Sequence, residues 1–286
     1  SEVSAMPAFA ATAAPTGLIS AGGDKEARLA WTAPSGVVNS YKLYRSLSSS
    51  GTYSQVASNI LTPSFTDTGL TNGTTYYYKV SAVNDVAESA LSSSRSVTPR
   101  LGMVVNVTPS TYSSAITNAV GGDEIVLADG EYAGSKIQIK YGTFSKPIIV
   151  RSANPLGAVF TSGQIELDRT EYITVKGVKN VSNYGMKFTG ASYCRLTESS
   201  IELNETALEG IDWMTIYGAN SHNNRIDHNE FKNKLDQGNF ITIGGPSGID
   251  NAQISQYDRI DHNYFYNIGP RAVNEKEAVR IGDSKV

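Results

Sequence analysis

Apolar and polar residues alternate in short runs over residues 16–100. The clearest runs are ARLAW at 27–31, SYKLYRS at 40–46 and TYYYKVSAV at 75–83. Alternation with a period of two, bounded by Gly, Pro, Asn and Ser, is typical of half-buried strands in antiparallel sheets. Seven or so such strands within about 85 residues predict a β-sandwich.

The pattern changes after Gly122. Short apolar runs then arrive at longer intervals, each followed by Gly, Asn or Ser, and no helical period separates them. One repeat is nearly identical: RIDHN at 225–229 recurs at 259–263, and an aromatic residue follows each copy within two positions. Related runs lie roughly 22 to 34 residues apart. That spacing, without crossover helices, predicts the stacked coils of a right-handed parallel β-helix.

The repeat also predicts which side chains meet, because equivalent strands of a solenoid stack in register. We expect Leu196, Ile226 and Ile260 to form one internal apolar ladder. We expect Asn229 and Asn263 to line a turn, where their amides bond one coil to the next.

One segment between the two patterns predicts a helix. It opens at 109–111 with Ser110 as the expected cap, and Gly121 ends it. Four apolar residues share one face of this segment: Tyr112, Ala115, Ile116 and Ala119. We expect the helix to cover the N-terminal end of the solenoid, where strand edges and core would otherwise be exposed.

These patterns divide the chain into three parts. They are a flexible Ala/Pro/Thr-rich spacer at 1–15, a sandwich domain at 16–100 and the β-helix at 101–286. Val286 closely follows a predicted strand, and no capping element comes after it. We therefore expect the β-helix to be incomplete at its C-terminus.

Composition and charge exclude several classes of protein and kinds of site. The chain has 24 Lys and Arg against 27 Asp and Glu, which argues against a nucleic-acid binder that relies on bulk charge. An apolar fraction of 40% argues against a disordered chain. No window approaches the roughly 18 consecutive apolar residues of a membrane helix. A single cysteine, Cys194, allows neither an internal disulfide nor a Cys/His zinc cluster.

Three other features predict structure and no chemistry. His228 and His262 repeat together, which favours a stacked structural ladder over catalysis. We expect Cys194 to be a small buried residue. The acidic run that begins at Glu202 and ends at Asp212 is typical of a solvated loop.

The sandwich segment resembles a fibronectin type III domain. The resemblance rests on Trp31 in the second strand, Tyr41 in the third, and the corner Leu70-x-x-Gly73-Thr74-x-Tyr76-x-Tyr78-x-Val80. It implies that Tyr76 hydrogen-bonds back across the corner and that Trp31 fills the core. We expect this domain to be a spacer or docking module without chemistry of its own. The predicted fold class is thus all-β: a fibronectin type III-like sandwich, then a right-handed parallel β-helix with an N-terminal capping helix.

From Gly121 onward the chain resembles polysaccharide lyase family six, the alginate lyase and chondroitinase B group. The matching stretches occur in family order: GGDEIVLADGEY at 121–132, KPIIVRSANPLGAVFTSG at 146–163, WMTIYGANSHNNRIDHNEFKNK at 213–234, YDRIDHNYF at 257–265 and NEKEAVRIGDS at 274–284. The resemblance implies β-elimination on an acidic uronate polysaccharide, with calcium offsetting the uronate carboxylate. A positive charge near that carboxylate is needed because a carbanion forms beside it.

The resemblance also suggests site residues. The metal-binding asparagine of the family matches Asn274, whose amide oxygen suits a hard cation. We assign substrate binding to Lys234, which would meet a sugar carboxylate, and to Arg280, which shares strand parity with Asn274.

No catalytic residue is assigned. The family's E-x-E-I-I-S-x-K-S and R-H-G motifs do not occur in the sequence, so we expect this chain to end before the catalytic coils and to be inactive by itself. An alternative set is Glu275, Glu277 and Lys285, which has the E-x-E spacing. Its continuation matches an earlier family segment better.

The function predicted from the family is a calcium-assisted polysaccharide lyase acting on alginate, with dermatan or chondroitin sulfate as less favoured substrates. A polymeric substrate indicates a secreted, periplasmic or cell-surface location in a bacterium. The alternative is a carbohydrate-binding or adhesive β-helix without catalysis. A glycoside hydrolase would need paired carboxylates on adjacent coils, and a uronate epimerase a D-P-H element, and we find neither.

Overall fold

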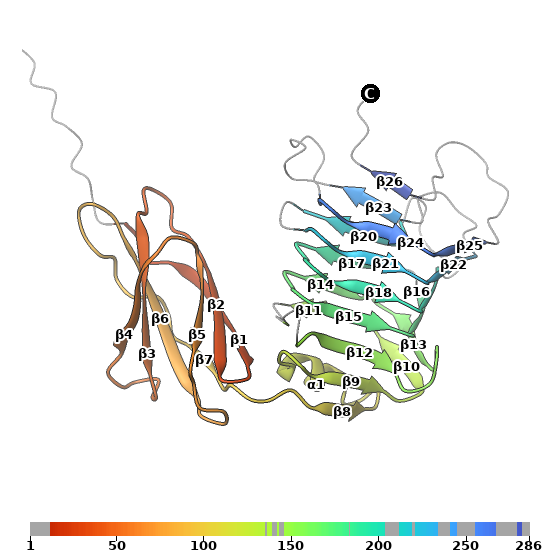
Figure 1. The fold of residues 1–286 in the computed structure, drawn as a ribbon, viewed down its shortest axis with the longest axis horizontal. Helices are drawn as coiled ribbons and strands as arrows, with labels where there is room; N and C mark the ends of the chain where they lie inside the picture. The colour runs from red at the N-terminus through yellow and green to blue at the C-terminus, as the bar shows by residue number, and fades with distance from the viewer. Residues whose placement is uncertain are drawn as a thin grey trace, which may run out of the picture. The chain divides into compact units, whose positions relative to one another are not determined.

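The computed structural model describes residues 12–134, 136–138, 142, 146–182, 184–203, 212–218, 221–233, 241–244, 255–266 and 279–281. The chain forms two compact units, Ser1–Leu101 and Gly102–Val286, and each is built from strands (Figure 1).

The first unit is an antiparallel sandwich of two sheets. One sheet has the order β1 (Thr16–Gly23), β2 (Glu26–Thr32) and β5 (Ser64–Thr68). The other has the order β4 (Ser54–Ile60), β3 (Ser40–Ser46), β6 (Tyr76–Val83) and β7 (Arg95–Val97). The seven strands of the predicted sandwich are therefore confirmed.

The alternation of the sequence places its apolar positions in the sandwich core. Trp31 and Tyr41 are buried, and their rings meet edge to face with centroids 5.2 Å apart. At the corner before β6, the backbone N–H of Thr71 donates to the Tyr76 hydroxyl at 3.0 Å. The burial of Trp31 and the bond to Tyr76 are those that the resemblance to a fibronectin type III domain implies.

A polar network also crosses the sandwich core. The buried Asp67 carboxylate on β5 accepts hydrogen bonds from Arg45 on β3 and from the Tyr78 hydroxyl on β6, both at 2.8 Å. Burial raises the pKa of Tyr78, and its bond to the carboxylate raises it further. Because an unpaired buried charge is costly, these three residues tie the two sheets together as a unit.

The second unit is a solenoid of three parallel sheets, in which each sheet takes every third strand from β9 onward, and β8 is added at the start of the β9 sheet (Figure 1). The β9 sheet contains β8 (Val104–Val107), β9 (Glu124–Leu127), β12 (Ile148–Ser152), β15 (Ile173–Lys176), β18 (Arg195–Thr197), β21 (Arg225–Asp227) and β24 (Arg259–Asp261). The β10 sheet contains β10 (Gly130–Ala133), β13 (Ala158–Ser162), β16 (Lys179–Ser182), β19 (Ser200–Leu203), β22 (Glu230–Lys232) and β25 (Tyr264–Tyr266). The β11 sheet contains β11 (Lys136–Gln138), β14 (Glu166–Asp168), β17 (Met186–Thr189), β20 (Met214–Tyr217), β23 (Ile241–Gly244) and β26 (Val279–Ile281). The predicted parallel solenoid is confirmed, and its right-handedness stays a prediction.

Stacked residues hold neighbouring coils in register. Leu196, Ile226 and Ile260 pair across three strands; the first two are fully buried, and Ile260 packs against the same core. The Asn229 side-chain amide donates to the carbonyl of Leu196 at 3.0 Å, and Asn263 donates to that of Ile226 at 2.8 Å. Both predicted ladders are therefore present.

The turn predicted at Asn229 and Asn263 is a corner between two sheets, and the residue before each asparagine has a conformation that the sequence pattern does not predict. Each RIDHN repeat joins two strands: β21 ends at Asp227 and β22 begins at Glu230, and β24 ends at Asp261 and β25 begins at Tyr264. His228 and His262 occupy the corner with φ of 56° and 54°. This left-handed conformation is uncommon for residues other than glycine, and it turns the chain from one sheet to the next.

The predicted helix is present as α1 (Tyr112–Asn118), and its buried Tyr112 and Ile116 belong to the solenoid core. The expected cap at Ser110 is wrong. Thr111 is the N-cap residue and makes no side-chain capping bond, whereas the Ser110 hydroxyl lies 3.0 Å from that of Thr108. The chain leaves the helix at Ala119, which is already extended, before it reaches Gly121. That α1 closes the end of the solenoid stays a prediction.

Candidate functional site

One of the predicted site residues lies on a described strand. Arg280 is the central residue of β26, and its backbone pairs in parallel with Thr242 on β23. Asn274 and Lys234 lie outside the described residues, as do the alternative residues Glu275, Glu277 and Lys285. The candidate site is therefore the outer face of the β11 sheet, to which Arg280 belongs.

Parallel register aligns one residue from each coil in a column on this face. From Arg280, the column continues coil by coil through Thr242, Thr215, Lys187 and Glu166. Adjacent members are about 4.8 Å apart, the spacing of hydrogen-bonded strands. The next residues along these strands point the other way, and those with described side chains fill the core: Leu167, Phe188, Ile216 and Ile243.

A lysine and a tyrosine meet on this face. The Lys187 ammonium lies 5.7 Å from the centroid of the Tyr217 ring, which follows one coil later in the neighbouring column. This is a cation–π distance. No carboxylate with a described position lies within 4.0 Å of the ammonium. The Glu166 carboxylate, next to Lys187 in the column, accepts a bond from the Thr189 hydroxyl at 3.0 Å.

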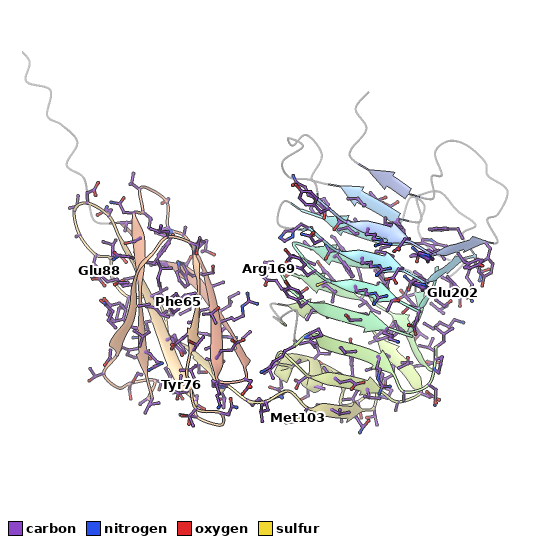
Figure 2. All side chains as sticks on the ribbon, viewed as in Figure 1. Phe65, Tyr76, Glu88, Met103, Arg169 and Glu202 are labelled. Atoms are coloured by element: carbon purple, nitrogen blue, oxygen red, sulfur yellow. The ribbon has the colours of Figure 1, made fainter. Side chains whose placement is uncertain are left out.

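Charges at the other end of the face are paired. Arg169, labelled in Figure 2, binds Asp168 with two hydrogen bonds of 3.0 and 3.2 Å. Two parallel bonds fix a guanidinium firmly, so Arg169 is held at the corner after β14. Of the described charges on this face, Lys187 therefore has the most freedom to bind an anion.

The outer face of the β9 sheet has a different character, because its charges match from coil to coil. Arg195 forms two bonds of 2.7 and 2.5 Å to Asp227, and Arg225 forms two of 3.1 Å to Asp261. Burial opposes ionisation of Asp227, but hydrogen bonds from Arg195 and His228 outweigh it and lower the pKa of this carboxyl. These residues are engaged with one another and serve to hold the coils in register.

The two repeated histidines extend this ladder. His228 lies 2.7 Å from Asp227 and His262 lies 3.0 Å from Asp261, in each case through Nδ1. The two rings stack with centroids 4.9 Å apart and an interplanar angle of 3°. The predicted structural ladder is confirmed.

The prediction for the acidic residue Glu202 is wrong. It was expected in a solvated loop, but it lies on β19, is 8% exposed and pairs with Lys179 at 2.6 Å (Figure 2). Strand pairing places Val181 beside it and Lys179 within reach on the previous coil, a relation that the local sequence does not show.

Neither a thiol nor a clustered metal site is available in the described ranges. Cys194 is buried as predicted, and burial raises the pKa of its thiol to about 11. It is therefore protonated at neutral pH and no nucleophile. Among the residues that the structure describes, no three His, Cys, Asp or Glu side chains come together as a metal site would require.

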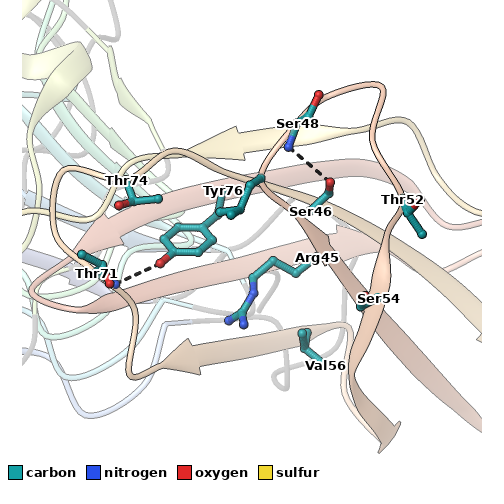
Figure 3. Close-up of a pocket in the computed structure, with 10 residues that line it drawn as sticks. Arg45, Ser46, Ser48, Thr52, Ser54, Val56, Thr71, Thr74 and Tyr76 are labelled. Atoms are coloured by element: carbon teal, nitrogen blue, oxygen red, sulfur yellow. Dashed lines mark hydrogen bonds between the residues drawn. The ribbon is translucent and has the colours of Figure 1, made fainter.

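The sandwich carries an open groove of about 690 Å³ (Figure 3). Hydroxyl side chains dominate its lining: Ser46, Ser48, Thr52, Ser54, Thr71 and Thr74. The Arg45 guanidinium lies 5.3 Å from the centroid of the Tyr76 ring and is already bound to Asp67. The charge in the groove is thus part of the core network.

Comparison with known proteins identifies the family. Residues 105–286 match chondroitinase B, and residues 13–98 match the fibronectin type III domain. The chain belongs to the chondroitinase B family. Both resemblances found in the sequence are confirmed at this level, and the chain is polysaccharide lyase-like.

Two solved structures resemble the solenoid of this chondroitinase B family member. A mannuronic acid specific polysaccharide family 6 lyase from human gut microbiota is 26% identical, with a TM-score of 0.53, over 63% of this chain and 44% of that chain. The family 6 alginate lyase AlyGC is 27% identical, with a TM-score of 0.53, over 63% of this chain and 26% of that chain. An amylopullulanase from Thermoanaerobacter thermohydrosulfuricus is 44% identical over 78 residues, which are 27% of this chain.

The chain spans less than half of either lyase and 5% of that amylopullulanase. No helix within the described ranges is both long enough and apolar enough to span a bilayer.

Sequence reasoning missed Lys187 and Tyr217. A signal for them exists, because MKFTG at 186–190 and MTIYG at 214–218 are aligned in register by their strands. Aligning these two runs as a repeat places the lysine and the tyrosine at outward positions of adjacent coils.

Proposed function

We propose that this protein cleaves an acidic uronate polysaccharide, alginate above dermatan or chondroitin sulfate, by β-elimination. The observation that carries the proposal is the chondroitinase B match over the whole solenoid, residues 105–286. Alginate is favoured because a similar solved structure is a mannuronic acid specific lyase and another is an alginate lyase.

The reaction sets clear electrostatic demands. A base removes the proton at C5 of the uronate, a double bond forms between C4 and C5, and the oxygen linked at C4 leaves. Negative charge develops next to the uronate carboxylate, so fixed positive charge close by lowers the barrier. We propose that Arg280 and Lys234 supply such charge by binding substrate carboxylates.

We extend the proposal to calcium, with Asn274 as one of its ligands. Calcium prefers oxygen ligands such as amides and carboxylates, and when bound it would offset the charge of the substrate carboxylate. Glu166 and Asp168 already bind Thr189 and Arg169, so we do not count them among the ligands. No catalytic base is assigned, since the E-x-E…K-S motif is absent from the sequence.

We also propose that the protein acts outside the cytoplasm, as a secreted, periplasmic or cell-surface protein. Its polymeric substrate is too large to enter a cell without prior cleavage. The same argument holds for the second candidate function, a carbohydrate-binding β-helix without catalysis, which the missing catalytic motif favours.

The test compares two samples: the protein purified from its native source, with its intact mass determined, and the 286-residue chain. Each is incubated with alginate, dermatan sulfate or a neutral glucan, and unsaturated uronate is followed by its ultraviolet absorbance. We expect the native protein to release unsaturated uronate from alginate, a chelator to abolish the release, and the 286-residue chain to release little or none. Retention of alginate by both samples without any release would favour the binding function.

A further inference from the structure

Lys187 differs from the other cations of the solenoid. Eight Lys or Arg side chains on the described strands and corners of the solenoid contact a carboxylate: Arg151, Arg169, Lys176, Lys179, Arg195, Arg225, Lys232 and Arg259. Lys187 contacts none in the described part of the chain, and its ammonium lies over the Tyr217 ring. An aromatic face attracts a cation without cancelling its charge, so this ammonium can still bind an anion.

The position of this ammonium is fixed by the fold. Met186 and Phe188 flank Lys187 on β17, and both are fully buried, which holds the strand against the core. Tyr217 is held in the same way by the buried Ile216 beside it. The lysine and its ring are therefore presented on a rigid sheet, which limits the entropy lost when a ligand binds.

The acidic groups nearby do not compete for the lysine. Glu166 directs an oxygen to the Thr189 hydroxyl, and Asp168 is bound by the guanidinium of Arg169. Glu166 is adjacent to Lys187 in the column, yet the two charged groups form no ion pair. Among the side chains that the structure describes in this column, Lys187 is the one that carries positive charge.

The column has the arrangement of a site for a linear polyanion. Lys187 and Arg280 are separated by three rungs of the sheet, about 14 Å at the usual strand spacing. The two rungs between them carry threonines, Thr215 and Thr242. Hydroxyl groups between two cationic positions suit a chain of sugars in which carboxylates recur.

We propose that Lys187 forms a distal subsite that binds the carboxylate of a uronate several sugars from the reacting bond, with Tyr217 as the residue that positions the ammonium. The substrate chain then runs along the solenoid axis, from the Arg280 rung to the Lys187 rung. This inference rests on the proposed acidic polysaccharide substrate and adds the direction in which the polymer lies.

The experiment measures binding of the 286-residue chain to alginate and to mannuronate oligomers of increasing length, by affinity electrophoresis and calorimetry. Lys187→Gln should weaken binding of long oligomers about tenfold, the worth of one charge-assisted bond, and leave the shortest oligomers unaffected. Lys187→Arg should stay within about twofold of the wild type, because it keeps the charge. Tyr217→Leu should weaken long-oligomer binding, and Tyr217→Phe should preserve it because the ring face is retained.

Lys176→Gln is the matched control, because Lys176 is a solvent-exposed lysine of the β9 sheet that pairs with Glu198. It should bind all oligomers as the wild type does, and circular dichroism should show every variant folded. If Lys187→Gln binds long oligomers as tightly as Lys176→Gln, the distal subsite is wrong while the proposed substrate stands. If the wild type binds no acidic polysaccharide at all, the proposed substrate class fails, and the subsite fails with it.

Discussion

The sandwich and the solenoid both contain a buried aspartate bound by an arginine, but the two architectures use the pair differently. In the sandwich, Arg45 and Asp67 join two sheets at a single point. In the solenoid, the Arg195–Asp227 pair recurs one coil later as Arg225–Asp261. An antiparallel sandwich brings together residues that belong to no sequence repeat, whereas a solenoid can form the same ion pair in each successive coil.

The number of partners differs as well. Asp67 accepts from Arg45 and Tyr78, while the fully buried Asp227 is approached by Arg195, His228 and Arg225. Removing either carboxylate leaves its donors without an acceptor, and the cost of that loss grows with their number. Loss of the Asp227 carboxylate is therefore expected to cost more unfolding free energy than loss of the Asp67 carboxylate.

The largest effect is expected from Asp227→Ala. It removes the acceptor of Arg195 and His228 together, and we expect the solenoid to lose about 3 kcal/mol of unfolding free energy. Urea denaturation monitored by circular dichroism would measure this loss. A loss below about 1 kcal/mol would contradict the view that the Arg–Asp ladder stabilises the coils.

Asp67→Ala should have the next largest effect, about 2 kcal/mol on unfolding of the sandwich. The matched variant Tyr78→Phe removes one of the two bonds and keeps the ion pair, so about 1 kcal/mol is expected. Equal losses for the two variants would mean that Arg45 contributes nothing to the network. Differential scanning calorimetry separates the two units if they unfold at different temperatures.

Acid should destabilise both units, because each contains a carboxyl whose pKa is lowered in the folded state. Variants in which such a carboxyl is replaced by a neutral side chain should lose less stability in acid. Burial raises the pKa of Glu88, but hydrogen bonds from Lys42, Tyr44 and Ser81 outweigh it and bring the pKa down to about 2. A depressed folded-state pKa stabilises above the unfolded value near 4.3 and is lost as pH falls through the folded value. The sandwich should therefore lose stability between about pH 4 and pH 2, and Glu88→Gln should flatten that part of its melting-temperature profile.

The smallest effect is expected from Glu198→Gln, which breaks the exposed pair with Lys176. Exposed ion pairs contribute little, so unfolding free energy should change by less than about 0.5 kcal/mol. The same denaturation experiment as for Asp227→Ala checks it. A larger loss would show that position on the solenoid matters more than burial.

Much of the fold follows from local patterns, whereas the charged site does not. The alternation around Trp31 and the repeat around Ile226 predict the sandwich and the ladder, because each pattern states which side chains face inward. Ion pairs depend on the neighbouring coil: Arg195 and Asp227 are 32 residues apart. Strand parity shows that Lys187 faces outward, but only the register with Tyr217 shows what it meets.

Several features cannot be predicted from the local sequence, and each has a physical reason. Ser110 is a good capping residue by type, but the chain places Thr111 at that position and binds the Ser110 hydroxyl to Thr108. His228 and His262, at the corners, adopt a conformation that favours glycine, so residue type gives no warning of that conformation. Arg280 is placed by register alone, and Asn274 and Lys234 stay predictions.

The asparagine bonds between coils have a consequence for how the protein folds. The bonds from Asn229 and Asn263 to the preceding coil join residues that are 33 and 37 positions apart in the sequence. The bond from Ser20 to Ser96 in the sandwich joins residues that are 76 positions apart. Closing a short loop costs less chain entropy, and contacts close in sequence speed folding. Two adjacent coils can therefore nucleate the solenoid and serve as a template for the next, while the sandwich must bring together β1, near its start, and β7, near its end, which belong to different sheets.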